Sequence, residues 1–97
     1  MEADQSIQEF LEFVIGGIVQ HGDRASIARR RDDRGTLYFD VTLDQEDVGR
    51  IIGRNGYVIS SLRSLLDASG EKQGTRVRLK IHALDHGGAS RPVDEEA

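Results

Sequence analysis

The sequence lacks cysteine and tryptophan altogether and has one proline among its 97 residues. Without cysteine, disulfide bonds and thiolate metal sites are excluded, and this usage is typical of proteins in a reducing cytoplasm. No apolar run approaches the roughly 20 residues that a membrane-spanning helix needs. The acidic N-terminus also lacks the basic region of a secretory signal. We therefore expect a small soluble cytoplasmic protein with no membrane partner.

Aromatic residues are scarce, at 5% of the sequence, and the apolar share is only 37%. The hydrophobic core must therefore be small and built mainly from isoleucine, leucine and valine. A chain of this length is most simply one domain, because domains commonly contain about 100–150 residues.

Basic residues are outnumbered overall, with a formal net charge of −4, but they are unevenly distributed. Residues 50–80 carry seven Lys and Arg against two Asp and Glu, whereas residues 1–23 carry five acidic residues and no basic one. Salt screens charges that are more than about 10 Å apart. A basic face within residues 50–80 is therefore expected to bind phosphate whatever the total charge.

Hydrophobic periodicity predicts six regular elements. A capping box at Ser6–Glu9 precedes an apolar stripe at helical spacing, and Leu37, Phe39 and Val41 alternate with polar residues as in a half-buried strand. In chain order the expected elements are a helix over 6–21, strands over 26–31 and 37–43, helices over 44–52 and 57–69, and a strand over 75–83.

The two later helices lie between the second and third expected strands. Crossovers of this kind usually join parallel strands, whereas residues 32–35, Asp-Asp-Arg-Gly, are typical of a hairpin turn. We predict an α+β domain over residues 1–84, in the order α-β-β-α-α-β, with a three-stranded mixed sheet and helices on one face. Residues 85–97 are small and acidic, and we expect a disordered acidic tail there.

Residues 51–59, IIGRNGYVI, place two glycines in an otherwise helical run, where each glycine costs about 0.5–1 kcal/mol relative to alanine. Their position between two expected helices makes them helix ends, so that Gly53, Arg54, Asn55 and Gly56 form a tight turn. The turn leads into a helix N-terminus, whose unpaired N–H groups and dipole attract anions. With Arg54 at its tip, this turn is a candidate phosphate site.

The stretch from Ile52 to Ile59 closely resembles the I-G-x-x-G-x-x-I signature of KH domains, whose G-x-x-G loop clamps the backbone of four nucleotides. The element order matches the type II KH arrangement, and a chain little longer than one such domain resembles the small bacterial stand-alone KH proteins, the KhpA-like family. The resemblance covers roughly residues 5–84. The arginine-rich hairpin and the acidic tail depart from it.

The resemblance implies single-stranded RNA in a groove between the two helices and the last strand, with Gly53, Arg54, Asn55 and Gly56 holding the backbone. It further implies post-transcriptional regulation or RNA chaperoning linked to cell shape, elongation and division. The partner would be a second copy of the chain or a larger KH-containing protein. No catalytic residue, metal or cofactor is implied. The remaining candidate RNA-binding residues are Ile52 and Ile59 as the groove floor, Arg50, and Arg76 and Arg78 as the far wall.

Several alternatives remain open at this point. The glycine turn is also compatible with a corner that binds nothing, although the strands argue against a DNA-binding helix-turn-helix protein and no P-loop motif is present. Ile52 and Ile59 are equally suited to the core, and the basic positions of the last strand to a solvated face. The arginines of residues 29–34 form either an ordinary charged edge or a second RNA contact. A protein–protein interaction module is the rival function.

No enzyme motif is evident. There is no cysteine nucleophile and no serine in a G-x-S-x-G elbow, and Asp44 and Asp47 are placed as helix-capping acids. The three histidines, His21, His82 and His86, have no metal-ligand spacing. We therefore expect a binding protein without catalysis.

Overall fold

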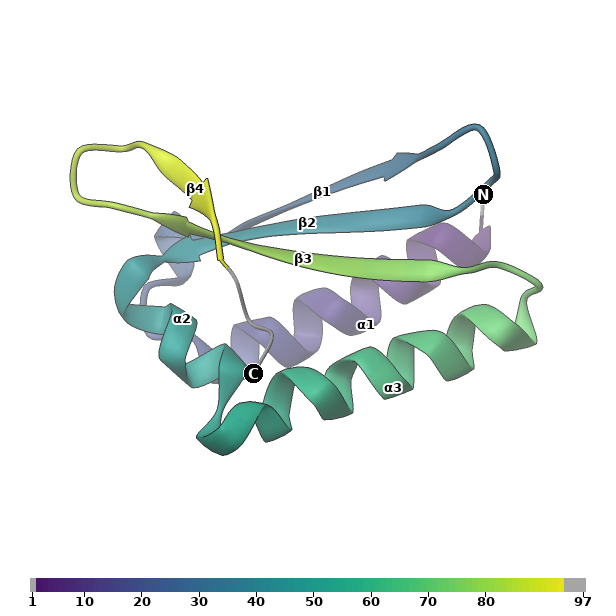
Figure 1. Cartoon of the computed structure of the whole chain (residues 1–97), viewed down its shortest axis with the longest axis horizontal. Helices are drawn as coiled ribbons and strands as arrows, with labels where there is room; N and C mark the ends of the chain where they lie inside the picture. The colour runs from purple at the N-terminus through teal and green to yellow at the C-terminus, as the bar shows by residue number, and fades with distance from the viewer. Residues whose placement is uncertain (1, 94–97) are drawn as a thin grey trace.

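The computed structural model describes residues 2–93, which form one helical layer against one sheet (Figure 1). Short 3-10 turns, η1 (Gly22–Arg24) and η2 (Arg54–Gly56), precede β1 and α3. The helices and strands are α1 (Glu2–Ile18), β1 (Ser26–Arg31), β2 (Leu37–Asp44), α2 (Gln45–Ile52), α3 (Tyr57–Lys72), β3 (Val77–Leu84) and β4 (Ser90–Pro92).

The sheet has the order β1-β2-β3-β4. β1 and β2 are antiparallel, with Ile27 opposite Val41, and β2 and β3 are parallel, with Phe39 opposite Leu79. The α+β class, the mixed sheet and the parallel crossover through α2 and α3 are thus confirmed. All three helices lie on the same side of the sheet (Figure 1), so its other face is open.

The core lies between the sheet and the helices because β2 and β3 alternate in burial. The side chains of Phe39, Val41 and Ile81 are at most 1% exposed, as is Leu11 of α1. Within residues 2–93, none of the helices combines the length and hydrophobicity needed to cross a bilayer.

The sheet contains four strands, not the three expected, because residues beyond 84 form a hairpin. Asp85 accepts hydrogen bonds from the backbone N–H groups of Gly87 and Ala89, both at 2.9 Å, and Gly88 has φ +88°. This turn brings Arg91 opposite Ala83 in an antiparallel pair. The predicted disorder is therefore wrong for the hairpin, since local composition did not indicate its pairing, and residues 94–97 lie outside the described residues.

The first helix also differs from its prediction. It begins at Glu2, which places Ser6 inside the helix and not at its N-cap, and it ends at Ile18, three residues earlier than expected. The capping-box pattern is a local signal, whereas Ile7 and Leu11, which are buried in the core, lie in the interior of the helix that begins before it.

Candidate nucleic-acid interface

The loop between α2 and α3 adopts a conformation that favours glycine. Gly53 and Gly56 have φ +77° and +75°, and Asn55 between them has φ +55°. At Gly53 a Cβ atom would collide with the side chain of Val58, whereas at Gly56 the same space is open. Gly53 therefore lets the chain pack on itself, and only Gly56 leaves room beside the backbone for an external group.

The N-terminus of α3 opens directly onto this loop. Gly56 is its N-cap, and no side chain within the described structure caps the helix. The N–H of Gly56 bonds to the carbonyl of Gly53 at 3.1 Å, and the N–H of Tyr57, the first residue of α3, bonds to the carbonyl of Arg54, so these two bonds close the turn. Arg54 and Asn55 are exposed at the tip. The positive end of the helix dipole and the Arg54 guanidinium together make a site suited to an anion.

The two isoleucines that flank the loop have different positions. Ile59 is 3% exposed and belongs to the core, whereas Ile52 is half-buried and packs against the edge of that core. Only Ile52 therefore offers surface beside the loop.

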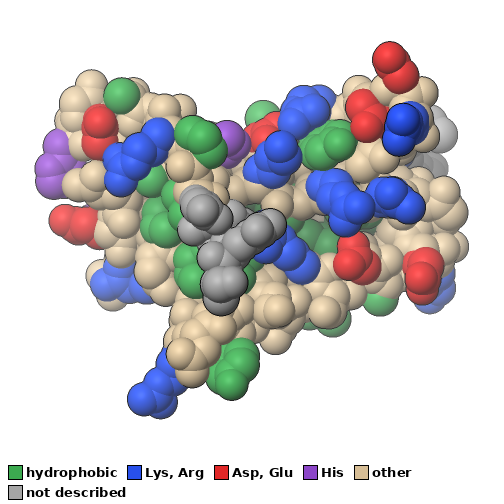
Figure 2. Space-filling view, viewed as in Figure 1, with side chains coloured by type: hydrophobic (Ala, Val, Ile, Leu, Met, Phe, Trp, Pro, Cys, Tyr) green, Lys and Arg blue, Asp and Glu red, His purple; other side chains and the backbone are tan. Residues whose placement is uncertain are grey.

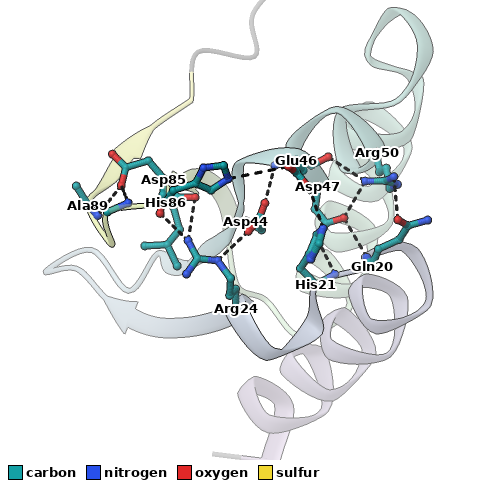
Figure 3. Close-up of polar contacts among 12 residues, drawn as sticks. Gln20, His21, Arg24, Asp44, Glu46, Asp47, Arg50, Asp85, His86 and Ala89 are labelled. Atoms are coloured by element: carbon teal, nitrogen blue, oxygen red, sulfur yellow. Dashed lines mark hydrogen bonds and ion pairs between the residues drawn. The ribbon is translucent and has the colours of Figure 1, made fainter.

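The side chain of Arg50 contacts the segment that follows α1, where Figure 3 shows it beside Gln20. Its guanidinium donates to the Oε1 atom of Gln20 at 3.1 Å, to Asp47 Oδ1 at 3.1 Å and to the carbonyl of Glu46 at 2.9 Å. The bond to Gln20 gives Arg50 a role in holding α2 against the segment that follows α1.

Asp47 is the centre of this connection. Its carboxylate is fully buried and accepts hydrogen bonds from the backbone N–H groups of Gln20 and His21 at 3.0 and 2.9 Å. Burial opposes ionisation of the carboxyl, but these two N–H groups and Arg50 outweigh it and hold the pKa of Asp47 below its usual value. Asp47 thus secures the segment that follows α1 to the first turn of α2.

Basic side chains on β3 border a cavity next to α3. An open cavity of about 400 Å³ is lined by Arg78, Lys80, Tyr38 and Arg63, among others. Arg63 lies six positions after Tyr57, about 9 Å along the helix. Because it also donates to the carbonyl of Leu79 at 3.0 Å, Arg63 joins α3 to the edge of β3.

Arg76 lies further from the loop, in a second cavity that it shares with the acidic residues Asp67 and Glu71. Arg78 and Asp67 line both cavities, so of the two arginines expected in a groove wall only Arg78 also borders the cavity of Arg63 and Lys80. Arg63 was not predicted from the sequence, because an arginine within a helix carries no local signal that a strand edge lies beside it.

The open face of the sheet carries a cluster of cations around Tyr38. The Arg30 guanidinium lies 4.2 Å from the ring centroid and the Lys80 ammonium 5.8 Å from it, within the range of cation–π attraction. Arg30 also pairs with Asp40 at 3.0 Å. Figure 2 shows Lys and Arg side chains gathered over β1 to β3, with a few acidic ones among them.

Two further arginines, both in β1, contact α1. Arg31 pairs with Asp4, and Arg29 donates weakly to Gln5 at 3.5 Å. These contacts make the arginines of β1 a link between the edge strand and the first helix.

His21, Asp44 and Glu46 each offer one atom that could coordinate a metal ion, and these three atoms lie within 4.8 Å of one another. Asp44 is the N-cap of α2 and accepts from the N–H of Glu46 at 2.8 Å, which is the largest cause of its lowered pKa. It also accepts from Arg24 at 2.7 Å (Figure 3). The cluster is therefore accounted for by ion pairs and a helix cap.

Comparison with known proteins matches the family described as "KhpA/KhpB, KH domain" over residues 8–81. Relatives named "RNA-binding protein KhpA" include one from Streptomyces coelicolor, 35% identical over 82% of this chain and 96% of the relative. Those from Thermotoga maritima and Borreliella burgdorferi are 36% and 33% identical, over 64% and 75% of this chain and 81% and 88% of theirs. No solved structure gives a significant match.

Proposed function

This chain belongs to the KhpA/KhpB family of KH domains, and on that premise we propose that it binds single-stranded RNA in the cytoplasm without catalysis. The names of its relatives, which include the words "RNA-binding protein", support RNA as the ligand. The cellular role that we propose is post-transcriptional regulation or RNA chaperoning, as the resemblance implies.

The geometry of the loop Gly53–Gly56 is the observation that carries the proposal. The start of α3 has no side-chain cap, the space beside Gly56 is open, and Arg54 is exposed two residues before Gly56. Phosphates of a nucleic-acid strand supply the matching negative charge and hydrogen-bond acceptors. We propose that Asn55, which is also exposed, adds a polar contact to the same strand.

From the loop, we propose that the bases follow α3 toward the edge of β3, over the half-buried Ile52. Arg63 and Arg78 line the cavity in that direction, so they are placed to meet the phosphates of the next nucleotides. Arg50 and Ile59 then contribute to RNA binding indirectly, because they fix α2 and the core beneath the loop. Arg76 lies at the outer end of the proposed RNA-binding surface.

The test replaces Arg54 and Asn55 with aspartate and measures affinity for a fluorescein-labelled single-stranded RNA by anisotropy. Loss of the phosphate contact and added repulsion should weaken binding more than about tenfold, with an unchanged circular dichroism spectrum. Arg34→Asp is the control, because Arg34 is equally exposed but lies in the β1–β2 turn. Unchanged affinity in the loop variant would refute the loop as the RNA clamp.

A protein-binding role is the second candidate, favoured by apolar side chains on the outer faces of α1 and α3. Phe13, Tyr57 and Leu65 are 81%, 66% and 53% exposed. Tyr57 and Leu65 line a shallow apolar cavity together with Val14 of α1, and exposed apolar patches are typical of interaction surfaces. We propose that this face pairs with the same face of a second copy, an arrangement that two-fold symmetry permits. Pairing two weak RNA modules would raise their joint affinity.

Leu65→Asp should abolish self-association in sedimentation velocity, because it places a charge in the contact. Ser64→Asp is the matched control, since Ser64 is the exposed neighbour on the same helix. A chain that stays monomeric at all concentrations, before any substitution, would contradict the pairing. If the Leu65 variant loses association while the loop variant keeps full RNA affinity, the protein-binding function is favoured over the RNA clamp.

A further inference from the structure

The face of the sheet that lies opposite the helices (Figure 1) carries a group of cations around one tyrosine. Side chains alternate between the two faces of a sheet, and the buried residues of β2 and β3 point toward the helices. On the opposite face lie Arg30, Tyr38, Arg78 and Lys80, which we call the Tyr38 cluster. We propose that this cluster is a second contact for the single-stranded RNA that the loop between α2 and α3 binds, an inference that rests on the proposed function and extends it.

The register of three strands brings the cluster together. Tyr38 lies opposite Arg30 on β1 and opposite Arg78 on β3. The Arg30 guanidinium and the Lys80 ammonium lie 4.2 and 5.8 Å from the centroid of the Tyr38 ring. Cation–π attraction to one ring therefore holds these two cations on the sheet, although like charges repel each other. An anion that lies over the sheet would offset this repulsion.

The cations of the cluster are only partly neutralised by carboxylates. Arg30 pairs with Asp40 at 3.0 Å, and Asp32, in the β1–β2 turn, accepts a weak hydrogen bond from the tyrosine hydroxyl at 3.4 Å. Among the described residues, neither Arg78 nor Lys80 pairs with a carboxylate, and both are exposed. These two cations are therefore available to a phosphate, in a chain whose net charge is −4.

The cluster is continuous with the surface already proposed for RNA. The cavity beside α3 is lined by Arg63 of that helix and by every member of the cluster except Arg30, with Asp67 as its acidic residue. The cavity thus connects the helical side of the molecule with the open face, across the edge of β3. β4 pairs only with residues 82–84 of β3, so it does not cover this part of the edge.

A nucleic-acid strand suits this surface because its phosphates continue beyond the loop. Leu66 and Asp67 line the cavity, and they lie nine and ten positions after Tyr57, about 15 Å along α3. A strand longer than the roughly four nucleotides that the loop clamps brings further phosphates to the cluster at a high effective concentration. Because phosphate contacts carry no sequence information, the second contact raises affinity for long RNA without changing the preferred sequence.

The experiment measures how the cluster affects binding of two labelled RNAs, by anisotropy and with the full chain. One has about four nucleotides, the number that a single loop clamps, and the other about 12, within the range of site sizes on single-strand-binding domains. Arg30→Gln combined with Lys80→Gln should weaken binding of the longer RNA about three- to tenfold. The shorter RNA should bind equally well, because its phosphates end at the loop.

Each RNA is compared between the variant and the unmodified chain, so the larger number of binding registers on the longer RNA cancels. Removal of two phosphate contacts should also reduce the salt slope for the longer RNA by about 0.7 for each contact. The slope for the shorter RNA should stay the same.

The matched control removes the same charge from the other side of the sheet. Arg29 is exposed and donates weakly to Gln5 of α1 at 3.5 Å, and Lys72 is exposed at the end of α3. Arg29→Gln combined with Lys72→Gln should change neither affinity by more than about twofold. A loss equal to that of the cluster variant would show that net charge acts and not the cluster, which contradicts the inference.

Amide chemical shifts of the unmodified chain provide a second test that needs no substitution. The longer RNA should shift the amide signals of Arg30, Tyr38 and Lys80 in addition to those of residues 53–56. The shorter RNA should shift only the signals of residues 53–56. Polyglutamate serves as the probe for an acidic protein and should shift the cluster signals less than the longer RNA does.

The possible failures are distinguishable. If the Arg54 and Asn55 variant loses RNA affinity while the cluster variant binds the longer RNA normally, the second contact is refuted and the RNA clamp stands. Equal weakening of both RNAs in the cluster variant would place the cluster within the clamp and overturn a separate contact. If neither RNA binds the unmodified chain, the proposed function fails, and the second contact with it. Cluster signals that polyglutamate shifts and the longer RNA does not would assign this face to an acidic protein instead.

Discussion

At the scale of single residues, the two loop glycines have different physical roles. Both have positive φ, but only Gly53 is also confined by Val58. A left-handed conformation costs a residue with a Cβ about 1–2 kcal/mol, and a collision that forces the neighbouring side chain to move adds to this cost. The sequence motif is symmetric, whereas the structural need for glycine is not.

We predict that Gly53→Ala lowers the free energy of unfolding by more than about 2 kcal/mol, whereas Gly56→Ala lowers it by about 1 kcal/mol. Urea denaturation of the two variants measures the difference. Gly16→Ala is the control, because Gly16 lies in α1 with open space around it, and it should be neutral or stabilising. Equal losses at positions 53 and 56 would contradict the asymmetry.

At the scale of the elements, buried or partly buried carboxylates hold the helices together. Asp47 connects α2 to the segment after α1, and Asp44 caps α2 while it binds Arg24 of η1. Both accept hydrogen bonds from backbone N–H groups that would otherwise be unsatisfied. Removing either carboxylate should therefore destabilise the fold more than the loss of an exposed ion pair.

We predict that Asp47→Asn lowers the free energy of unfolding by about 1–3 kcal/mol at neutral pH, because an amide cannot accept all the bonds that the carboxylate accepts. Denaturant titration measures the loss. Asp33→Asn, in the exposed β1–β2 turn, is the matched control and should change little. A neutral effect at position 47 would show that water satisfies the Gln20 and His21 amides instead.

The same carboxylate makes stability depend on pH. The pKa of Asp47 in the folded chain lies below its unfolded value, so its contribution is fully present above about pH 4 and is lost as the pH falls through the folded pKa. Asp32, Asp44 and Asp85 shift in the same direction. Stability should therefore fall below about pH 4, and the fall should be shallower in Asp47→Asn, as measured by denaturation at several pH values.

At the scale of the whole molecule, an acidic chain presents a local basic surface. The net charge is −4, yet Arg63, Arg78 and Lys80 share one cavity and Arg54 stands at the tip of the loop. The three cations outnumber Asp67, the acidic residue among those that line the cavity, and salt screens the more distant acids.

We predict that affinity for single-stranded RNA falls with salt, with a slope of log K against log salt of about −0.7 for each phosphate contacted. Four clamped nucleotides would give a slope of roughly −2 to −3. Arg54→Gln should reduce the slope by about 0.7, as measured by titrations over a range of potassium chloride concentrations. A slope near zero would contradict binding through phosphates.

Much of the architecture was predictable from the sequence alone. The alternation of residues 37–43 and 77–81, the glycine pair and the crossover rule led to the correct class, the parallel pairing and the correct site for the α2–α3 loop. These features are encoded locally, because burial on one face of a helix or strand repeats at a period that can be read along the chain.

The tertiary structure alone decided how that framework is used. Arg50, a candidate RNA ligand from its position in the chain, is bonded to Gln20, and Ile59, a candidate floor residue, lies in the core. β4 formed where composition indicated disorder, because its stability comes from the edge of β3 and the turn at Asp85. Such contacts join residues far apart in sequence, and no local pattern records which partner a polar group will find in space.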